Sequence, residues 1–305
     1  MSADSEISHS KTSAASSITQ RLISSLPRLW VEHCAEVLRR IPFLKRPYRH
    51  VAALFKDRDG IVSAGPSRGL RFNAGQSDSR YLLGAFEPAV QEVLAVHLRP
   101  GMTFYDVGAN VGFHAVLAAR LVGNAGQVHC FEPLPENVER IHHNARLNHF
   151  GQITVHPVAL AQIDSTAEFR VSERPTFGAL SNSPIAVDKQ VGTIEVAVRR
   201  LDGFFEESNL PGPNVIKVDI EGSEIDFLAG AETVIRRYRP LLLVELHGTN
   251  SGVAGWLTRL SYDSDVVGGG PIEEAPWAAL AIATPKEQPE TRTIVAGICR
   301  QFSGR

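Results

Sequence analysis

The feature that most constrains the fold is a regular alternation of short apolar segments with longer helical ones between residues 103 and 246. The expected strands lie at 103–107, 127–131, 153–160, 215–220 and 241–246, and helices are expected at 111–122, 135–148 and 224–238. Such alternation predicts a mostly parallel sheet with helices on both faces, a doubly wound α/β fold. Two late apolar segments, 278–283 and 293–299, predict an antiparallel hairpin at one edge of this sheet.

Two regions do not follow this alternation of strands and helices. Residues 161–210 contain segments at 168–172 and 193–199 that alternate like exposed antiparallel strands, with a polar loop between them. Residues 1–18 are rich in Ser, Ala and Thr, which predicts a disordered tail. Residues 19–80 are interpreted as a helical capping extension, and residues 81–305 as the α/β domain.

Composition excludes several classes of protein. A formal net charge of −2 gives no basic field for nucleic acid. Cys34, Cys130 and Cys299 lie far apart, which favours free thiols over disulfides or a metal site. No apolar run reaches the roughly 18–20 residues that span a bilayer, and the N-terminus does not resemble a secretory signal. A soluble, cytoplasmic protein is expected.

The helical periodicity at 21–40 carries several arginines. A basic amphipathic segment of this kind can lie on an anionic membrane. Packing over the α/β core, or against a second subunit in a homo-oligomer, is the favoured alternative.

A glycine-containing loop, Asp106-Val-Gly-Ala-Asn-Val-Gly112, joins an expected strand to an expected helix. Glycines let such a loop turn tightly and approach a ligand closely. The loop lacks both the GxGxxG pattern of dinucleotide-binding proteins and the lysine of a P-loop. An acid before the glycines would repel a pyrophosphate but suits the cationic amino group of S-adenosylmethionine.

The next expected strand ends in Phe131-Glu132-Pro133, and a carboxylate at this position can accept both hydroxyls of an adenosine ribose. Asp106 and Glu132 thus stand at the carboxyl ends of neighbouring strands, where open α/β sheets bind ligands.

These motifs resemble those of the FkbM family of methyltransferases. Two further segments share the resemblance: Ile216-Lys217-Val-Asp219-Ile-Glu221-Gly222-Ser-Glu224 and the earlier Tyr81-Leu-Leu-Gly84-Ala-Phe-Glu87-Pro88. The resemblance implies a seven-stranded class I methyltransferase fold, S-adenosylmethionine as cofactor, and O-methylation of a sugar or natural product. By position, it implies cofactor-binding roles for Asp106, Gly108, Asn110, Gly112 and Glu132. Glu87 and Asp219 are also predicted to bind the cofactor. Thr176-Phe177-Gly178-Ala179 departs from the family's usual turn, which leaves substrate contacts there undefined.

Charged residues end the last two expected parallel strands. Lys217, Asp219 and Glu221 share one face of their strand, as Glu245 and His247 do on theirs. Asp219 and His247 are the predicted catalytic residues, with His247 as the base that removes the proton of the acceptor hydroxyl. A structural Lys217 ion pair, a helix-capping Glu224 and a merely hydrogen-bonded His247 are the alternatives.

Two further functional hypotheses stay open. No resident metal is predicted, yet a divalent cation that acidifies the hydroxyl could instead be bound by Asp219, Glu221, Glu245 and His247. A non-catalytic binding module with the same fold is the other alternative. The expected partner is a small-molecule or glycan hydroxyl acceptor, with no nucleic acid.

Overall fold

The computed structural model describes residues 57–75, 80–172, 178–180, 183 and 190–302. These residues form two compact units that divide between Pro88 and Ala89, further along the chain than the predicted domain start at residue 81. The predictions for the tail and for the basic helix fall outside the described residues. No helix in the described part of the chain has the length and apolarity needed to cross a membrane.

The described part of the first unit is small. It contains an antiparallel pair, β1 (Gly60–Ile61) and β2 (Arg71–Phe72), and the short helix α4 (Arg80–Leu83). The ring of Tyr81 lies between those of Phe72 and Phe86 in two tilted contacts, with centroids 5.6 Å from Phe72 and 4.1 Å from Phe86. Glu87, next to the end of this unit, has a left-handed backbone conformation, with φ of 40°.

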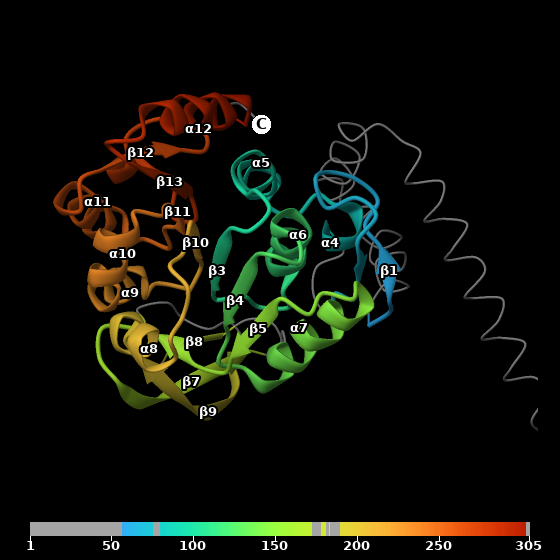
Figure 1. The fold of residues 1–305 in the computed structure, drawn as a ribbon. Coiled ribbons are helices and arrows are strands. Elements are labelled where there is room, and N and C mark those ends of the chain that lie inside the picture. The colour runs from blue at the N-terminus through green and yellow to red at the C-terminus, as the bar shows by residue number, and fades with distance from the viewer. Residues whose placement is uncertain (1–56, 76–79, 173–177, 181–182, 184–189, 303–305) are drawn as a thin grey trace, which may run out of the picture. The chain divides into compact units, whose positions relative to one another are not determined.

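The second unit is built on a seven-stranded sheet in the order β12-β13-β11-β10-β3-β4-β5 (Figure 1). Its strands are β3 (Thr103–Val107), β4 (Gln127–Phe131), β5 (Ile153–His156), β10 (Val215–Val218), β11 (Leu241–Glu245), β12 (Tyr262–Val266) and β13 (Leu280–Pro285). β13 runs antiparallel to both of its neighbours, and the other pairings are parallel. The predicted doubly wound, mostly parallel seven-stranded sheet is confirmed.

Helices cover both faces of this sheet. One face packs against α8 (Leu201–Glu207), α9 (Glu224–Gly230), α10 (Glu232–Tyr238) and α11 (Asn250–Arg259), whose apolar side chains form the main core with alternate residues of β3, β10 and β11. α6 (Phe113–Val122) contacts β3, β4 and β5, while α7 (Pro135–Leu147) contacts β5. α5 (Pro88–His97) precedes β3.

One predicted strand is wrong, because residues 293–299 lie within α12 (Pro289–Gln301). Their β-branched composition favours a strand, but Val295, Ile298 and Cys299 are buried at helical spacing. Pro289 begins the helix, and Glu290 and Arg300 suit its two ends. The second hairpin strand is instead β12, whose polar sequence Tyr-Asp-Ser-Asp-Val did not indicate a strand.

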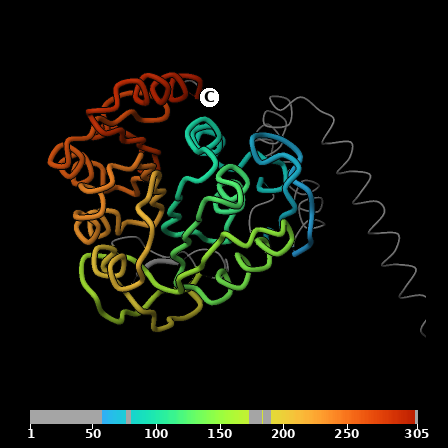
Figure 2. Tube along the Cα trace, viewed as in Figure 1, coloured from blue at the N-terminus to red at the C-terminus, as the bar shows by residue number. Residues whose placement is uncertain are grey.

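The predicted interruption after β5 forms a separate four-stranded sheet in the order β6-β9-β7-β8. Its strands are β6 (Ala159–Leu160), β7 (Ser165–Ser172), β8 (Gly178–Leu180) and β9 (Gln190–Arg199). The chain leaves the large sheet here and returns to it through α8 (Figure 2). Phe169, Val196 and Val198 pack against Leu134, which anchors this small sheet beside the end of β4.

Candidate active site

A cavity opens at the carboxyl ends of β3, β4 and β10. Its lining includes Gly108, Asn110, Glu132 and Asp219, four of the residues that the sequence predicts to bind the cofactor. Phe169 lines it from the small sheet. Parallel sheets place ligand sites at this end because the loops after successive strands diverge there.

Gly108 allows the loop after β3 to pass very close to the end of β10. Its φ is 75°, and a Cβ atom there would lie 1.9 Å from the Asp219 carbonyl oxygen. Asn110 and Gly112 are also left-handed, with φ of 53° and 80°. Gly112 does not line the cavity but packs against Ile141 of α7. Glycine at 108 is therefore a steric requirement for closing two strand ends around the cavity.

Glu132 is buried and held by the backbone. Its Oε2 accepts a hydrogen bond from the Asn110 amide at 2.8 Å, and its Oε1 accepts one from the Leu134 amide at 3.0 Å. Burial raises the pKa of Glu132 to about 7, although these amides and Asn137 lower it in part. A carboxylate has about four acceptor sites, so beside these three hydrogen bonds it retains capacity to accept from a ligand hydroxyl.

Asp106 does not line the cavity. It pairs in register with Lys217 of β10 and is 1% exposed. Neither carboxylate oxygen makes a hydrogen bond of good geometry to the described residues. Burial raises the pKa of Asp106 to about 6, against the opposing effect of the Lys217 ammonium. The structure thus buries Asp106 in the sheet, close to Lys217, the cation that pairs with Asp219.

Lys217 and Asp219 form the ion pair that the sequence left as an alternative. The Lys217 Nζ donates to Asp219 Oδ2 at 3.1 Å, and the lysine is only 4% exposed. Asp219 follows β10 directly, and its backbone amide donates to the Val107 carbonyl. The ion pair with the buried Lys217 orients the Asp219 carboxylate. Its other oxygen, Oδ1, therefore faces His247 and lies 3.8 Å from Nε2.

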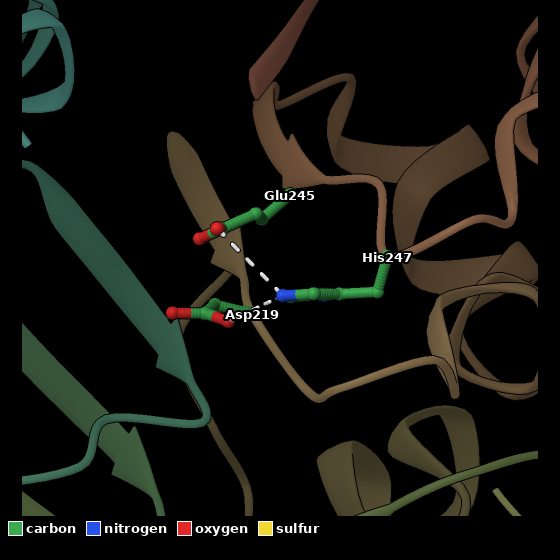
Figure 3. A group of neighbouring side chains, drawn as sticks. All are labelled: Asp219, Glu245 and His247. Carbon is green, nitrogen blue, oxygen red and sulfur yellow. Dashed lines mark ion pairs between the residues drawn. The ribbon is translucent and has the colours of Figure 1, made fainter. Parts of the chain in front are cut away.

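His247 is surrounded by carboxylates. Its Nδ1 lies 3.0 Å from Glu224 Oε1, and its Nε2 points toward Asp219 and Glu245 (Figure 3). The Nε2 distances are 3.4 Å to Glu221 Oε2 and 3.6 Å to Glu245 Oε1. Burial alone would lower the pKa of His247, but the bond to Glu224 and the surrounding charges raise it to about 9. The ring therefore carries a proton at neutral pH when no other cation is present.

Glu224 does more than begin α9. It is completely buried, and its carboxylate accepts from the Gly222 amide and the Thr249 hydroxyl, each at 2.9 Å, besides facing His247. Sequence reasoning assigned it only a capping role, because 23 residues separate it from His247. Trp277 was also missed: its ring meets the His247 ring edge-to-face at 5.3 Å, yet it is 54% exposed.

The structure therefore brings together most of the predicted site. Gly108, Asn110, Glu132 and Asp219 share the cavity, and Asp219 connects it to His247. Glu87 belongs to the first unit, and its cofactor role stays a prediction.

Three features together define the class I methyltransferase architecture: the strand order of the large sheet, the glycine turn after β3 and the acid at the end of β4. Residues 106–265, just over half of the chain, match the family model described as "Methyltransferase FkbM domain". The chain belongs to this family of methyltransferases, which confirms the resemblance seen in its motifs.

Several known proteins are similar to this chain. Hexuronic acid methyltransferase AglP of Haloferax volcanii is 26% identical over 174 residues, which cover 53% of this chain and 68% of AglP. The 2-O-methyltransferase NoeI of Sinorhizobium fredii is 24% identical over 161 residues, covering 49% of this chain and 65% of NoeI. A crystal structure of methyltransferase FkbM from Methylobacillus flagellatus KT aligns with a TM-score of 0.43 and 18% identity, covering 68% of this chain and 55% of that one. The chain thus spans between about half and two thirds of these proteins.

Proposed function

We propose that this chain transfers the methyl group of S-adenosylmethionine to a hydroxyl oxygen of a sugar or glycan. The observation that carries the proposal is the cavity itself, which joins the Gly108 turn and Glu132 to Asp219. Asp219 in turn faces His247, so a cofactor site and a group able to handle protons adjoin each other.

The residues present fit this cofactor. Gly108 lines the cavity and lets the loop after β3 approach the end of β10, where a Cβ atom would overlap the Asp219 carbonyl, and Glu132 is a carboxylate at the strand end that suits ribose hydroxyls. When bound, S-adenosylmethionine supplies a methyl group on a positively charged sulfur, and the carbon–sulfur bond breaks as the acceptor oxygen bonds to the carbon. Asp219 lines the cavity and is the carboxylate proposed to attract a cationic group of the cofactor, whereas Asp106, to which the sequence assigned that role, does not line it.

The acceptor hydroxyl must lose its proton as methylation proceeds. His247 and Asp219 remain the proposed catalytic residues, because Asp219 lines the cavity and His247 adjoins Asp219. The raised pKa of His247 means that its ring must first give up a proton before it can accept one. The surrounding acids hold the ring in place, and the enzyme's main contribution is to align the oxygen with the methyl carbon and exclude water.

Trp277 favours a sugar as the acceptor. A large exposed aromatic ring in contact with the predicted catalytic histidine offers an apolar platform beside the site. The C–H faces of a sugar ring pack well on such a surface, while its hydroxyls reach polar groups. The names of AglP and NoeI, a hexuronic acid methyltransferase and a 2-O-methyltransferase, agree with this proposal.

The test has two stages. Calorimetry with S-adenosylhomocysteine, the demethylated product, should show micromolar binding, and NAD should show none. A methyl-transfer screen should then compare uronic acids, neutral sugars and non-sugar alcohols. Binding of NAD alone would refute the cofactor, and methylation restricted to non-sugar alcohols would refute the acceptor class.

A further inference from the structure

We propose that Asp219, Glu245 and His247 bind one divalent cation, of the Mn²⁺ or Mg²⁺ kind, next to the cofactor cavity. The three side chains come from the ends of β10 and β11 and from the loop that follows β11, and they converge on one point (Figure 3). Each contributes one potential ligand atom, a carboxylate oxygen or the imidazole Nε2.

The spacing of these atoms suits an ion. Nε2 of His247 lies 3.8 Å from Asp219 Oδ1 and 3.6 Å from Glu245 Oε1, and the three ligand atoms all lie within 4.8 Å of one another. Two ligands that are each about 2.1 Å from one ion stand at most about 4.2 Å apart. Small side-chain rotations therefore complete three bonds, and Glu221 Oε2, 3.4 Å from Nε2, is in reach as a fourth ligand.

The histidine is arranged as metal-binding histidines usually are. Such residues donate the hydrogen of their other ring nitrogen to a carboxylate, which fixes the ring and directs its free lone pair at the metal. Here Nδ1 faces Glu224, which the Gly222 amide and the Thr249 hydroxyl hold in turn. Nε2 belongs to a ring that is about 96% buried, points into the group, and makes no hydrogen bond to the described residues.

Charge also favours a cation here. Asp219, Glu221, Glu224 and Glu245 all lie within 4 Å of the His247 ring nitrogens, and Lys217 is the cation that pairs with Asp219. Four buried or half-buried carboxylates around one imidazole leave an excess of negative charge, which is costly without a compensating cation. Carboxylates with a single imidazole suit hard or borderline divalent ions.

The role of this ion rests on the proposed function. Asp219 would be shared between the ion and the cofactor cavity, so the ion would lie beside the methyl donor. An acceptor hydroxyl bound to it would become more acidic and would be positioned for methylation. With the ion in place, Nε2 of His247 would be a ligand and not the base.

The experiment measures metal binding and cofactor binding separately. The full chain is stripped with a chelator and dialysed, then titrated with Mn²⁺ by calorimetry and by electron paramagnetic resonance of the free ion. We expect one Mn²⁺ per chain, displaced by excess Mg²⁺. Asp219→Asn and Glu245→Gln should each weaken Mn²⁺ binding at least about tenfold, and Glu224→Gln about 10–100-fold as a supporting residue. Glu273→Gln, an exposed acid in η2 (Ile272–Glu274), is the matched control and should change nothing.

Melting temperatures show whether each variant is folded. Binding of S-adenosylhomocysteine to the metal-free protein and to Glu245→Gln should stay within about twofold of the untreated protein. A folded wild-type chain that binds no Mn²⁺, or that binds it equally well in both ligand variants, would overturn the metal site. If Mn²⁺ binds as expected but S-adenosylhomocysteine does not, the metal site stands and the proposed methyl donor fails.

Discussion

The two sides of the active site differ in whether the backbone or the side chains form the site. On the β3–β4 side, the backbone dominates: a glycine turn approaches the end of β10, and two main-chain amides hold Glu132. On the β10–β11 side, charged side chains dominate, with His247 among four acids. The first side can recognise a cofactor whose shape is constant. The second can bind cations and move protons, and it is more sensitive to charge than to shape.

The largest effect is expected from Gly108→Ala, which tests the backbone side. The added methyl group would lie 1.9 Å from the Asp219 carbonyl, at a φ of 75° that alanine rarely adopts. We expect calorimetry to show no S-adenosylhomocysteine binding and the free energy of unfolding to fall by several kcal/mol, on the order of 3. Gly151→Ala, where nothing lies within 4 Å, is the control. Normal cofactor binding by Gly108→Ala would show that the turn is not needed.

The second prediction tests the side-chain side. His247→Ala removes the group on which the four acids converge, so turnover should fall by about 10²–10⁴-fold. S-adenosylhomocysteine affinity should change little, because His247 does not line the cavity. His142→Ala, on α7, serves as control and should keep full turnover. If His247→Ala keeps most of its turnover, His247 is not the base. Catalysis would then depend on Asp219 as the base, or only on alignment of the acceptor oxygen with the methyl carbon.

A smaller effect is expected from pH, through Glu132. The pKa of this carboxyl is raised to about 7, so it is mostly protonated at pH 6 and mostly ionised at pH 8. Only the ionised form accepts from both ribose hydroxyls, so cofactor affinity should rise with pH across this range, by at most about tenfold per unit. In Glu132→Gln, affinity should be at least about tenfold weaker at pH 8, the scale of a hydrogen bond to a charged group.

The pH slope separates Glu132 from the other acids. Glu221 also has a pKa raised to about 7, by burial and by its acidic neighbours, so part of any slope could arise on the other side of the site. The slope should therefore flatten in Glu132→Gln and persist in Glu221→Gln. The reverse result would move the pH dependence to the acids around His247.

The smallest effect is expected from Trp277→Ala. Losing one aromatic packing surface corresponds to about 0.5–1.5 kcal/mol, a rise in acceptor KM of roughly two- to tenfold. Cofactor affinity should not change, and Trp277→Phe should retain most of the wild-type KM because it keeps a ring. Steady-state kinetics with the best sugar acceptor provide the measurement. An unchanged KM in Trp277→Ala would remove the aromatic platform from the acceptor site.

What the sequence determined by itself was local. The strand–helix rhythm, the turn from Asp106 to Gly112 and the acid at 132 depend on neighbouring residues, and strand ends are adjacent once the sheet is parallel. Gly108, Asn110, Glu132 and Asp219 could therefore be assigned to one site in advance, and the structure brings them together.

Features of the site and of the fold that depend on burial and long-range packing became visible only in the structure. Asp106 begins the most informative motif, yet it is buried in register with Lys217 and does not line the cavity. Residues 293–299 have a strand-like composition, but their buried face packs as the helix α12. The partnership of Glu224 with His247 joins the start of α9 to the loop after β11, and no local pattern encodes the angle at which these elements pack. The same packing sets the charge state of His247, because a pKa depends on which groups surround a side chain and how deeply they are buried.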